Sequence, residues 1–492
     1  MKNVSKEIFL NSLVCPGLGW LMRSGKIEYT SDTELPLGVK FRIEQGLEIG
    51  KRARDLYPDG ALVDEVDLTT AANRTESLME DADCKVILEG AFLTDNFAAR
   101  ADIVRRVDNG WYLYEVKSGI NDKEEYIDDM AYTTMVLNRC GVNLSGISLL
   151  LVSKDFRLGM ENEKLFTEID HTEEVLIKVE EFKPYWEQVE ELTRAPEKPE
   201  PALIYECRGC DLFKDCLGKD VNNHIFELPR LGKSRFNDFE ELGIYRIEAI
   251  PADFSLTENQ ARVRDCVVSG QTFTGENLSI ALVSITFPAY YLDFETVMTA
   301  IPLYPDIAPY TQIPTQYSIH TCPDLDSVPE HREYLADPSR DCRREIAENL
   351  IRDIGKEGSI VTYSTFEKAV INSLMRWFPD LSPELNSLSE RIVDLEAIIR
   401  KNFYHPDFHG STSIKTILPV LVPEMSYDGM EIADGDSAMA AFSYLAMGKY
   451  EAGEAEVIKR QLLRYCEQDT LAMVKLHRKL LAISHIYENP PF

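Results

Sequence analysis

Two groups of acidic residues in this sequence have the spacing that binding of divalent cations requires. In "VSITFPAYYLDFET", residues 283–296, Asp293 and Glu295 end an apolar, aromatic run. Such a run predicts a strand, and side chains two residues apart on a strand project from one face. Two carboxylates held in this way can bind a pair of metal ions, which polarise a phosphate and activate water. The pattern indicates metal-assisted hydrolysis of a phosphodiester.

Further polar residues that suit the same site lie closer to the C-terminus. The segment "VIKRQLLRYCEQDTLAMVKLHRKLL" predicts an amphipathic helix, on which Tyr465 and Asp469 are four residues apart and share a face. Between this helix and the strand, "GSIVTYSTFEKAVI" predicts a short strand followed by a helix that begins near Phe366 and Glu367. The order of these elements favours one site assembled from distant parts of the chain.

The other acidic group lies in "ARADIVRRVDNGWYLYEVKSG", residues 99–119. Asn-Gly is the preferred centre of a two-residue hairpin turn, so we predict a turn at 109–110 between two strands. Counting outward from that turn places Val104 opposite Glu115, and Asp102 opposite Lys117. Because side chains alternate between faces, Asp102, Glu115 and Lys117 would emerge on one face of the hairpin.

Two carboxylates and a lysine on one face suit the same kind of hydrolysis. The acids Asp102 and Glu115 would hold Mg²⁺ or Mn²⁺, and the ammonium of Lys117 would position water or stabilise the developing charge. The alternative is a surface hairpin with a cross-strand ion pair between Asp102 and Lys117. Spacing alone leaves both interpretations open.

This hairpin, with its "EVK" ending, resembles the PD-(D/E)XK nuclease core and specifically its RecB-like branch. The resemblance implies that Asp102 and Glu115 bind metal and that Lys117 is catalytic. Members of that family usually have a QxxxY motif in the next helix, and Thr133 occupies the expected glutamine position here. The family's upstream helix often supplies a metal-binding histidine, for which this chain offers Glu44 and Glu48.

Three cysteines fall at C-x2-C-x5-C spacing in "CRGCDLFKDC", residues 207–216. A tetrahedral metal or a [4Fe–4S] cluster takes four ligands. Some RecB-like nucleases, including AddB-type subunits and CRISPR-adaptation exonucleases, bind a cluster through this triplet and a cysteine before the core. That resemblance implies a structural [4Fe–4S] cluster, with zinc as the alternative, and its ligands would be Cys15, Cys207, Cys210 and Cys216.

The C-terminal pattern resembles the DEDD exonucleases of the RNase-H-like (DnaQ-type) fold, in their tyrosine subtype. The resemblance implies that four acids hold two metal ions and that Tyr465 positions the attacking water. These acids would be Asp293, Glu295, Glu367 and Asp469. The family normally has aspartate in the middle motif, so Asp394 in "RIVDLEAI" is an alternative to Glu367.

Nearly the whole chain resembles a bacterial family in which a RecB-like module is fused through a helical connector to an exonuclease-like domain. We therefore expect an α/β protein with a RecB-like nuclease module at 1–216, a helical connector at 217–280 and an RNase-H-like module at 281–492.

Composition limits the partners. The formal net charge is −31, from 52 basic and 83 acidic residues, so nucleic acid would be bound through a local groove or through metal ions rather than by the overall field. No apolar run is long enough to span a membrane. Ten cysteines are too few for a disulfide scaffold and suit a reducing cytoplasm.

Three hypotheses follow. The first is a cytoplasmic metal-dependent nuclease with two sites, acting on an end of single-stranded DNA or RNA. The second is a scaffold that binds nucleic acid or a partner, in which one or both nuclease folds are inactive. The third is a zinc-stapled protein with no role on nucleic acid, which requires both acidic patterns to be accidental.

Overall fold

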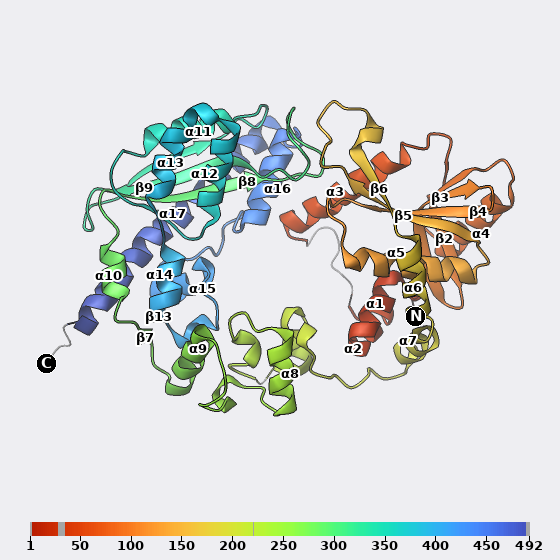
Figure 1. The fold of residues 1–492 in the computed structure, drawn as a ribbon, viewed down its shortest axis with the longest axis horizontal. Coiled ribbons are helices and arrows are strands. Elements are labelled where there is room, and N and C mark those ends of the chain that lie inside the picture. The colour runs from red at the N-terminus through yellow and green to blue at the C-terminus, as the bar shows by residue number, and fades with distance from the viewer. Residues whose placement is uncertain (1, 28–34, 220, 489–492) are drawn as a thin grey trace. The chain divides into compact units, whose positions relative to one another are not determined.

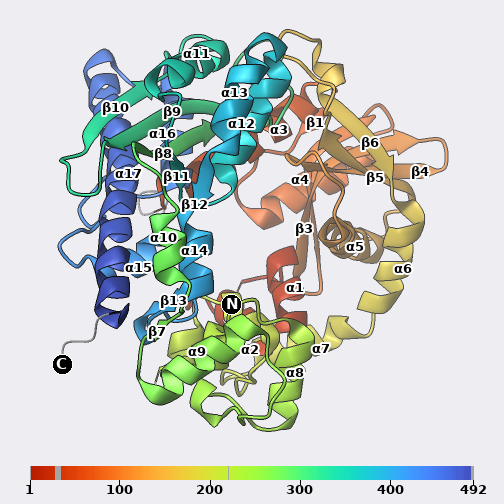
Figure 2. The same ribbon diagram turned by 60° about the vertical axis from the view of Figure 1, so that its left-hand side comes forward.

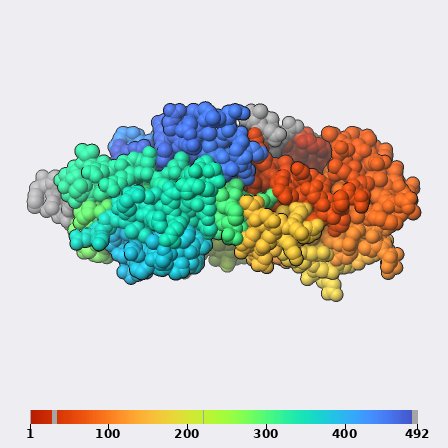
Figure 3. Space-filling model, turned by 90° about the horizontal axis from the view of Figure 1, so that it is seen from above, coloured from red at the N-terminus to blue at the C-terminus, as the bar shows by residue number. Residues whose placement is uncertain are grey.

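The computed structural model describes residues 2–27, 35–219 and 221–488. The chain forms two compact units, and the first consists of Met1–Leu203 together with Met298–Thr311. The second consists of Ile204–Val297 and Gln312–Phe492. In Figure 1 and Figure 3 the chain is coloured from red at the N-terminus to blue at the C-terminus, so residues before Leu203 run from red to yellow. The predicted boundaries at residues 216 and 280 stay predictions.

The first unit contains a six-stranded mixed sheet in the order β1-β2-β3-β4-β5-β6. The β2–β3, β3–β4 and β5–β6 pairs are antiparallel, whereas β1–β2 and β4–β5 are parallel. The parallel pair β4–β5 is connected through a helix, as parallel neighbours require. The strands are β1 (Ala61–Leu62), β2 (Val86–Thr94), β3 (Phe97–Val107), β4 (Gly110–Lys117), β5 (Leu144–Val152) and β6 (Phe166–Asp170).

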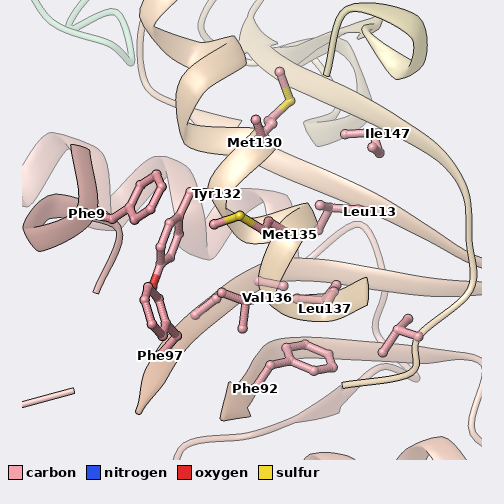
Figure 4. Close-up of a cluster of buried hydrophobic side chains, with 14 of the residues drawn as sticks. Phe9, Phe92, Phe97, Leu113, Met130, Tyr132, Met135, Val136, Leu137 and Ile147 are labelled. Carbon is pink, nitrogen blue, oxygen red and sulfur yellow. The ribbon is translucent and has the colours of Figure 1, made fainter. Parts of the chain in front are cut away.

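The helices of the first unit bury apolar side chains against this sheet. They are α1 (Lys6–Val14), α2 (Pro16–Arg23), α3 (Leu37–Arg54), α4 (Leu68–Glu80), α5 (Glu124–Arg139), α6 (Thr172–Phe182) and α7 (Tyr185–Arg194). Figure 4 shows the core, in which Phe9 of α1 and Phe97 of β3 lie beside Tyr132 of α5. The Tyr132 hydroxyl donates to the backbone oxygen of Val4 at 2.6 Å, so the segment just before α1 is held beside α5.

A short segment from much later in the chain completes the first unit. Residues 298–311, which connect β8 (Ala289–Val297) to β9 (Ile313–Cys322), pack on this unit. The backbone N–H of Ala300 donates to Gln45 at 2.9 Å, and the Tyr310 hydroxyl donates to the carbonyl of Ser118 at 2.7 Å. Ser118 directly follows β4, so this segment lies at the end of the strand that carries Glu115 and Lys117.

The predicted register of the β3–β4 hairpin is wrong by two residues. Val107 pairs with Gly110, and Val104 lies opposite Leu113 rather than Glu115. Asp102 is therefore not opposite Lys117. Gly110 follows the turn instead of lying in it: its φ is 144°, and a Cβ there would be 2.4 Å from the carbonyl oxygen of Asn143. The glycine is required by this close approach and not by a type I′ turn.

The second unit contains a five-stranded mixed sheet in the order β10-β9-β8-β11-β12. β10, β9 and β8 are antiparallel, whereas β8, β11 and β12 are parallel. Strands β7 and β13 form a separate antiparallel pair. The strands not yet given are β7 (Phe273–Thr274), β10 (Glu330–Leu335), β11 (Ile360–Thr362), β12 (Ile392–Asp394) and β13 (Phe403–Tyr404).

Helices pack on this sheet, and α17 is the longest of those described. Figure 2 shows α17 beside β9 and β10, and it also packs on β8. The expected strand followed by a helix near Phe366 is confirmed as β11 and α12, and the amphipathic helix around Tyr465 is confirmed as part of α17. The helices of the second unit, not all of which contact this sheet, are α8 (Lys233–Glu241), α9 (Glu258–Ser269), α10 (Leu278–Val283), α11 (Arg343–Asp353), α12 (Phe366–Trp377), α13 (Ser382–Glu390), α14 (Leu395–Asn402), α15 (Ile414–Leu421), α16 (Gly435–Ala446) and α17 (Ala452–Glu488).

Both units combine helices with mixed sheets, so the α/β class expected from the sequence is confirmed. Within the described part of the chain, no helix has the length and apolar character needed to cross a bilayer.

Candidate active sites

The first acidic group lies on neighbouring strands of the first unit. Asp102 of β3 accepts a hydrogen bond from the backbone N–H of Val116 at 2.7 Å. Burial and the nearby carboxylate of Glu115 raise the pKa of Asp102 to about 7. The structure therefore brings Asp102 and Glu115 together, although the register differs from the predicted one. A shift of two residues preserves the face of every side chain, which is why this proximity survives.

Two lysines neutralise Glu115 of β4, whose side chain is only 4% exposed. Lys6 of α1 donates to Glu115 Oε1 at 2.8 Å, and Lys117 lies 3.1 Å from the same oxygen. Burial alone would raise the pKa of Glu115, but these two ammonium groups outweigh it and lower the pKa. Lys117 also donates to Asp129 of α5, and Lys6 lies 3.5 Å from Asp129.

Lys6 and Asp129 were not predicted as members of this site. Lys6 is 109 residues from Glu115, and nothing in its sequence surroundings indicates the contact. Asp129 offers a signal, because it lies one helical turn before Thr133 and so shares its face of α5. Thr133 itself is buried, and its hydroxyl donates to the carbonyl of Asp129 at 3.2 Å. Asp129, one turn before Thr133, is thus the polar residue of α5 that contacts Lys117.

The two glutamates considered in place of the upstream histidine lie on α3. Glu48 forms an ion pair with Arg52 at 2.9 Å, one turn away on the same helix. Besides Glu115, the carboxylate of Glu89 on β2 also raises the pKa of Asp102. Glu89 is itself paired with Arg54 at 2.6 Å. The role of Glu44 and Glu48 as metal ligands stays a prediction.

The second acidic group is assembled by strand β8 and helix α17. Asp293, Glu295 and Asp469 each offer a carboxylate oxygen, and these atoms lie within 4.8 Å of one another. Glu367, in the first turn of α12, is buried, and its carboxyl group interacts with that of Asp293. The structure therefore brings four of the predicted residues together from three elements.

Burial raises the pKa of every carboxyl group in this cluster, and repulsion between its carboxylates adds to the effect at Asp293 and Glu295. The pKa of Asp293 is raised well above its ordinary value by burial and by Asp469, Glu295 and Glu367. Burial raises the pKa of Glu295 to about 8, with Asp469 as the next cause. Burial also raises the pKa of Glu367 to about 7 and that of Asp469 to about 6. A cation placed among these groups would remove the repulsion.

Two tyrosines and a lysine surround Asp469. The Tyr427 hydroxyl donates to Asp469 Oδ1, and Tyr465, one turn before Asp469 on α17, interacts with the same carboxylate. The ammonium of Lys415 lies 5.6 Å from the ring centres of both tyrosines. Its charge lowers the pKa of Glu295 and Asp469, in each case against the larger effect of burial. Tyr427 and Lys415 were not predicted.

The two alternatives for the middle acid differ in their surroundings. Glu367 is 3% exposed and interacts with Asp293, whereas Asp394 is the N-cap of α14. Asp394 Oδ1 accepts from the backbone N–H of Ala397 at 2.9 Å, a bond that satisfies the helix terminus. The geometry therefore favours Glu367 over Asp394 beside Asp293. An unpredicted thiol, Cys466, also donates to Asp293 Oδ2 at 3.4 Å.

The three closely spaced cysteines lie on two consecutive short helical segments, the first 3-10 and the second π-helical. Cys207 is in the 3-10 turn Tyr205–Gly209, and Cys210 ends that turn. Cys216 lies in the short turn Lys214–Gly218, and its N–H donates to the carbonyl of Leu212. Cys15, between α1 and α2, belongs to the first unit, and the triplet belongs to the second. The thiol donors fit a [4Fe–4S] cluster or zinc equally, so the cluster stays a prediction.

One comparison with known families bears on these sites. Residues 290–413 match a family described as a domain of unknown function (DUF2779). The matched stretch contains Asp293, Glu295 and Glu367, and it ends before α17, which carries Tyr465 and Asp469. No curated protein sequence matches the chain.

Proposed function

We propose that the chain is a divalent-metal-dependent nuclease that hydrolyses phosphodiester bonds from the 3′ end of single-stranded DNA or RNA in the cytoplasm. The carboxylate cluster of the second unit is its principal active site. The observation that carries the proposal is the gathering of Asp293, Glu295 and Asp469 oxygens within 4.8 Å, with Glu367 beside them.

The donor set fits Mg²⁺ or Mn²⁺. Both ions prefer carboxylate oxygen to nitrogen or sulfur, and all four acids supply it. Four crowded acids, of which Glu367 and Asp469 are buried and the other two half-buried, destabilise a folded chain with one nearby lysine unless a ligand compensates them, because burying unpaired charge is costly. When bound, the cations would polarise the phosphate and lower the pKa of the attacking water.

The chain's own residues provide the rest of the chemistry. The pKa of Tyr465 is raised by burial and by the surrounding carboxylates, so its hydroxyl stays protonated and orients the attacking water through a hydrogen bond. Tyr427 holds Asp469 by its short hydrogen bond and fixes the direction of that carboxylate. Lys415 supplies a positive charge near Glu295 and Asp469 that can offset charge on the reacting phosphate.

The first unit is proposed as a second, RecB-like site, in which Asp102 and Glu115 would bind metal and Lys117 would act on water. One observation favours the alternative that this unit binds nucleic acid or a partner without cutting. Lys6 and Lys117 already compensate Glu115, so the charge of this carboxylate is balanced in the absence of any metal ion.

The arrangement of the two sheets supports the proposed modules. Three antiparallel strands followed by two parallel strands, with α12 and α13 between β11 and β12, are compatible with the RNase-H-like assignment. The β3–β4 hairpin followed by α5 and the parallel strand β5 is compatible with the PD-(D/E)XK assignment. A [4Fe–4S] cluster on Cys15, Cys207, Cys210 and Cys216 would be a structural staple.

The test uses full-length protein purified without oxygen and supplied with Mg²⁺ or Mn²⁺. Single-stranded DNA and RNA, labelled at the 5′ or the 3′ end, are incubated with wild type, Asp469→Asn or Lys117→Ala. Losing a hydrogen-bond partner of a metal ligand costs about 10–100-fold, so losing Asp469 should lower the rate by at least about 100-fold. Lys117→Ala should keep most of the exonucleolytic activity.

The matched control is Asp428→Asn, which removes an exposed aspartate next to Tyr427 and should leave the rate unchanged. Immediate loss of a 3′ label with a ladder from the 5′ label would establish the polarity. If wild type cuts neither substrate, or Asp469→Asn cuts as well as wild type, the proposed activity is wrong and the scaffold hypothesis replaces it.

A further inference from the structure

A second cluster of metal-ligating side chains lies on the other part of the same sheet. His320 of β9 and His331 of β10 are directly opposite one another, with ring centres 4.6 Å apart. Glu467 of α17 completes the group, its Oε1 lying 3.7 Å from His331 Nδ1. One ligand atom of each residue lies within 4.8 Å of the other two. None of these residues belongs to the carboxylate cluster.

A chain of hydroxyl groups contacts one nitrogen of each ring, Nδ1 of His320 and Nε2 of His331. The Thr470 hydroxyl can give its one proton to the carbonyl of Glu467 at 3.1 Å or to that of Cys466 at 3.4 Å. With that proton on a carbonyl, Thr470 Oγ1 accepts from His320 Nδ1 and from Ser318 Oγ, each at 2.8 Å. In this arrangement Ser318 accepts from His331 Nε2 at 2.9 Å.

This network leaves a lone pair on Nε2 of His320 and on Nδ1 of His331. The second of these nitrogens is the one that lies beside Glu467. Burial, together with His331, lowers the pKa of His320 to about 4, so its ring is neutral at pH 7. A metal ligand histidine needs this state, with its other ring nitrogen donating to a fixed oxygen.

We propose that His320, His331 and Glu467 form a binding site for a divalent transition metal ion of the zinc class. Two imidazole nitrogens and one carboxylate oxygen suit zinc better than Mg²⁺, which prefers oxygen alone. Zinc ligands at 2.0–2.1 Å in tetrahedral geometry are about 3.3 Å apart. The three ligand atoms here lie within 4.8 Å of one another, so small side-chain movements would bring them to that separation. Glu333, two residues from His331 on β10, interacts with both His331 and Glu467 and is the candidate for a fourth ligand.

The site would fasten α17 to the edge strand of the sheet. β10 is the last strand of the sheet, and Glu467 is 46% exposed, which leaves a path for the ion to enter. At 100° per residue, Glu467 and Asp469 project about 160° apart around α17. The ion would therefore hold the helix on the flank opposite the one that carries Asp469. This inference does not depend on nuclease activity.

The test titrates Zn²⁺ into full-length protein in competition with a chromophoric chelator, with saturating Mg²⁺ to occupy the carboxylate cluster. Wild type should bind one more zinc ion per chain than the double variant of His331→Gln and Glu467→Gln. Each single variant should weaken binding by at least about 100-fold, because both change a ligand rather than its support. X-ray absorption of the bound zinc should show nitrogen and oxygen at about 2.0–2.1 Å, whereas cysteine sulfur would lie at about 2.3 Å.

The matched control is His405→Gln, because His405 Nδ1 and Asp407 are also 3.7 Å apart but belong to a short turn. Thr470→Val keeps every ligand and removes the hydroxyl that orients His320, so it should weaken binding about 10–100-fold. His331 and Glu467 are both partly exposed, so the variants that change them should unfold like wild type in the absence of zinc. Zinc bound with equal affinity by all variants, bound only through sulfur, or not bound by wild type overturns the proposal.

Discussion

The two acidic groups of this protein hold very different local charge. In the first unit, three carboxylates (Asp102, Glu115 and Asp129) lie with two ammonium groups (Lys6 and Lys117), an excess of one negative charge from three minus two. In the second unit, four carboxylates lie near the single ammonium of Lys415, an excess of three from four minus one. The two sites have similar sets of acids that could bind metal ions, but they differ in the number of lysine side chains beside those acids.

The pKa values record this difference. In the first unit the pKa of Asp102 is raised to about 7, but that of Glu115 is lowered despite its burial, whereas in the second unit the pKa values of all four acids are raised. A buried carboxylate near a lysine is already compensated, but a crowded group of buried carboxylates takes up either protons or metal ions. We infer that the second site depends on metal ions for its charge balance and that the first does not.

Competition between protons and metal ions gives the largest expected effect. Glu295, with a pKa of about 8, and Glu367, with a pKa of about 7, hold protons in the metal-free protein below those values. Binding of Mn²⁺ must displace them, so affinity falls as the pH falls. With one proton displaced per ion from a group of pKa about 8, the apparent dissociation constant should rise about 50-fold between pH 8 and pH 6. Titration of Mn²⁺ monitored by electron paramagnetic resonance at three pH values measures it.

The control for this prediction is Asp469→Asn. Removing one charge relieves the repulsion on Glu295, so the remaining affinity should be weaker and less dependent on pH. An affinity of wild type for Mn²⁺ that does not change between pH 6 and pH 8 would contradict the proposed difference between the two sites.

Removing Lys6 tests the charge balance of the first unit. Lys6→Gln leaves Glu115 buried with only Lys117 as a partner, which should cost about 1–3 kcal/mol of unfolding free energy. Because the folded pKa of Glu115 is lowered, its stabilising contribution is present above the ordinary glutamate pKa and is lost as the pH falls through the lowered value. The difference between variant and wild type in urea unfolding should therefore be largest near pH 7 and vanish in acid.

Repeating the unfolding experiment with Mn²⁺ tests whether this unit binds a metal ion. Without Lys6, Asp102 and Glu115 have an uncompensated negative charge, so Mn²⁺ should restore part of the lost stability in Lys6→Gln and add little to wild type. Lys183→Gln, which breaks an exposed ion pair with Glu180, is the matched control and should cost about 0–1 kcal/mol. Failure of Mn²⁺ to restore any stability would mean that the first unit has no metal site and is a binding module.

Sequence patterns predicted the strands and helices that carry these acids, but they did not predict that Lys6 and Lys415 lie beside them. The face shared by Asp102, Glu115 and Lys117 depends only on the alternation of a strand, so it survived an error of two residues in the hairpin register. That register was wrong because Gly110 is required by its approach to Asn143, a contact between strands that the turn preference of Asn-Gly does not include.

The residues that set the charge come from elsewhere in the chain. Lys6 reaches Glu115 from 109 positions away, and Tyr427 reaches Asp469 from 42 positions away. Neither contact joins residues at the spacing of one helix or one strand, so no local sequence pattern indicates it. The opposed pair of His320 and His331 is similarly visible only once β9 and β10 are aligned. Tertiary packing therefore decides the electrostatics of sites whose acids are visible in sequence.

Tyr427→Phe gives the smallest expected effect and separates a positioning role from a structural one. The hydroxyl of Tyr427 donates to Asp469 and lowers the pKa of that carboxyl group against the larger effect of burial. Its loss should slow hydrolysis by roughly tenfold, mostly in kcat, and should move the acidic limb of the pH–rate profile to higher pH because Asp469 then holds its proton more tightly. Tyr450→Phe, in the turn before α17, removes a tyrosine hydroxyl elsewhere and should change neither quantity. A merely structural role for Tyr427 would lower the amount of active protein and leave the pH profile in place. Such an unshifted profile would mean that Asp469 is oriented by Tyr465 alone, and the charge balance of the second site would then rest on the metal ions without help from this hydrogen bond.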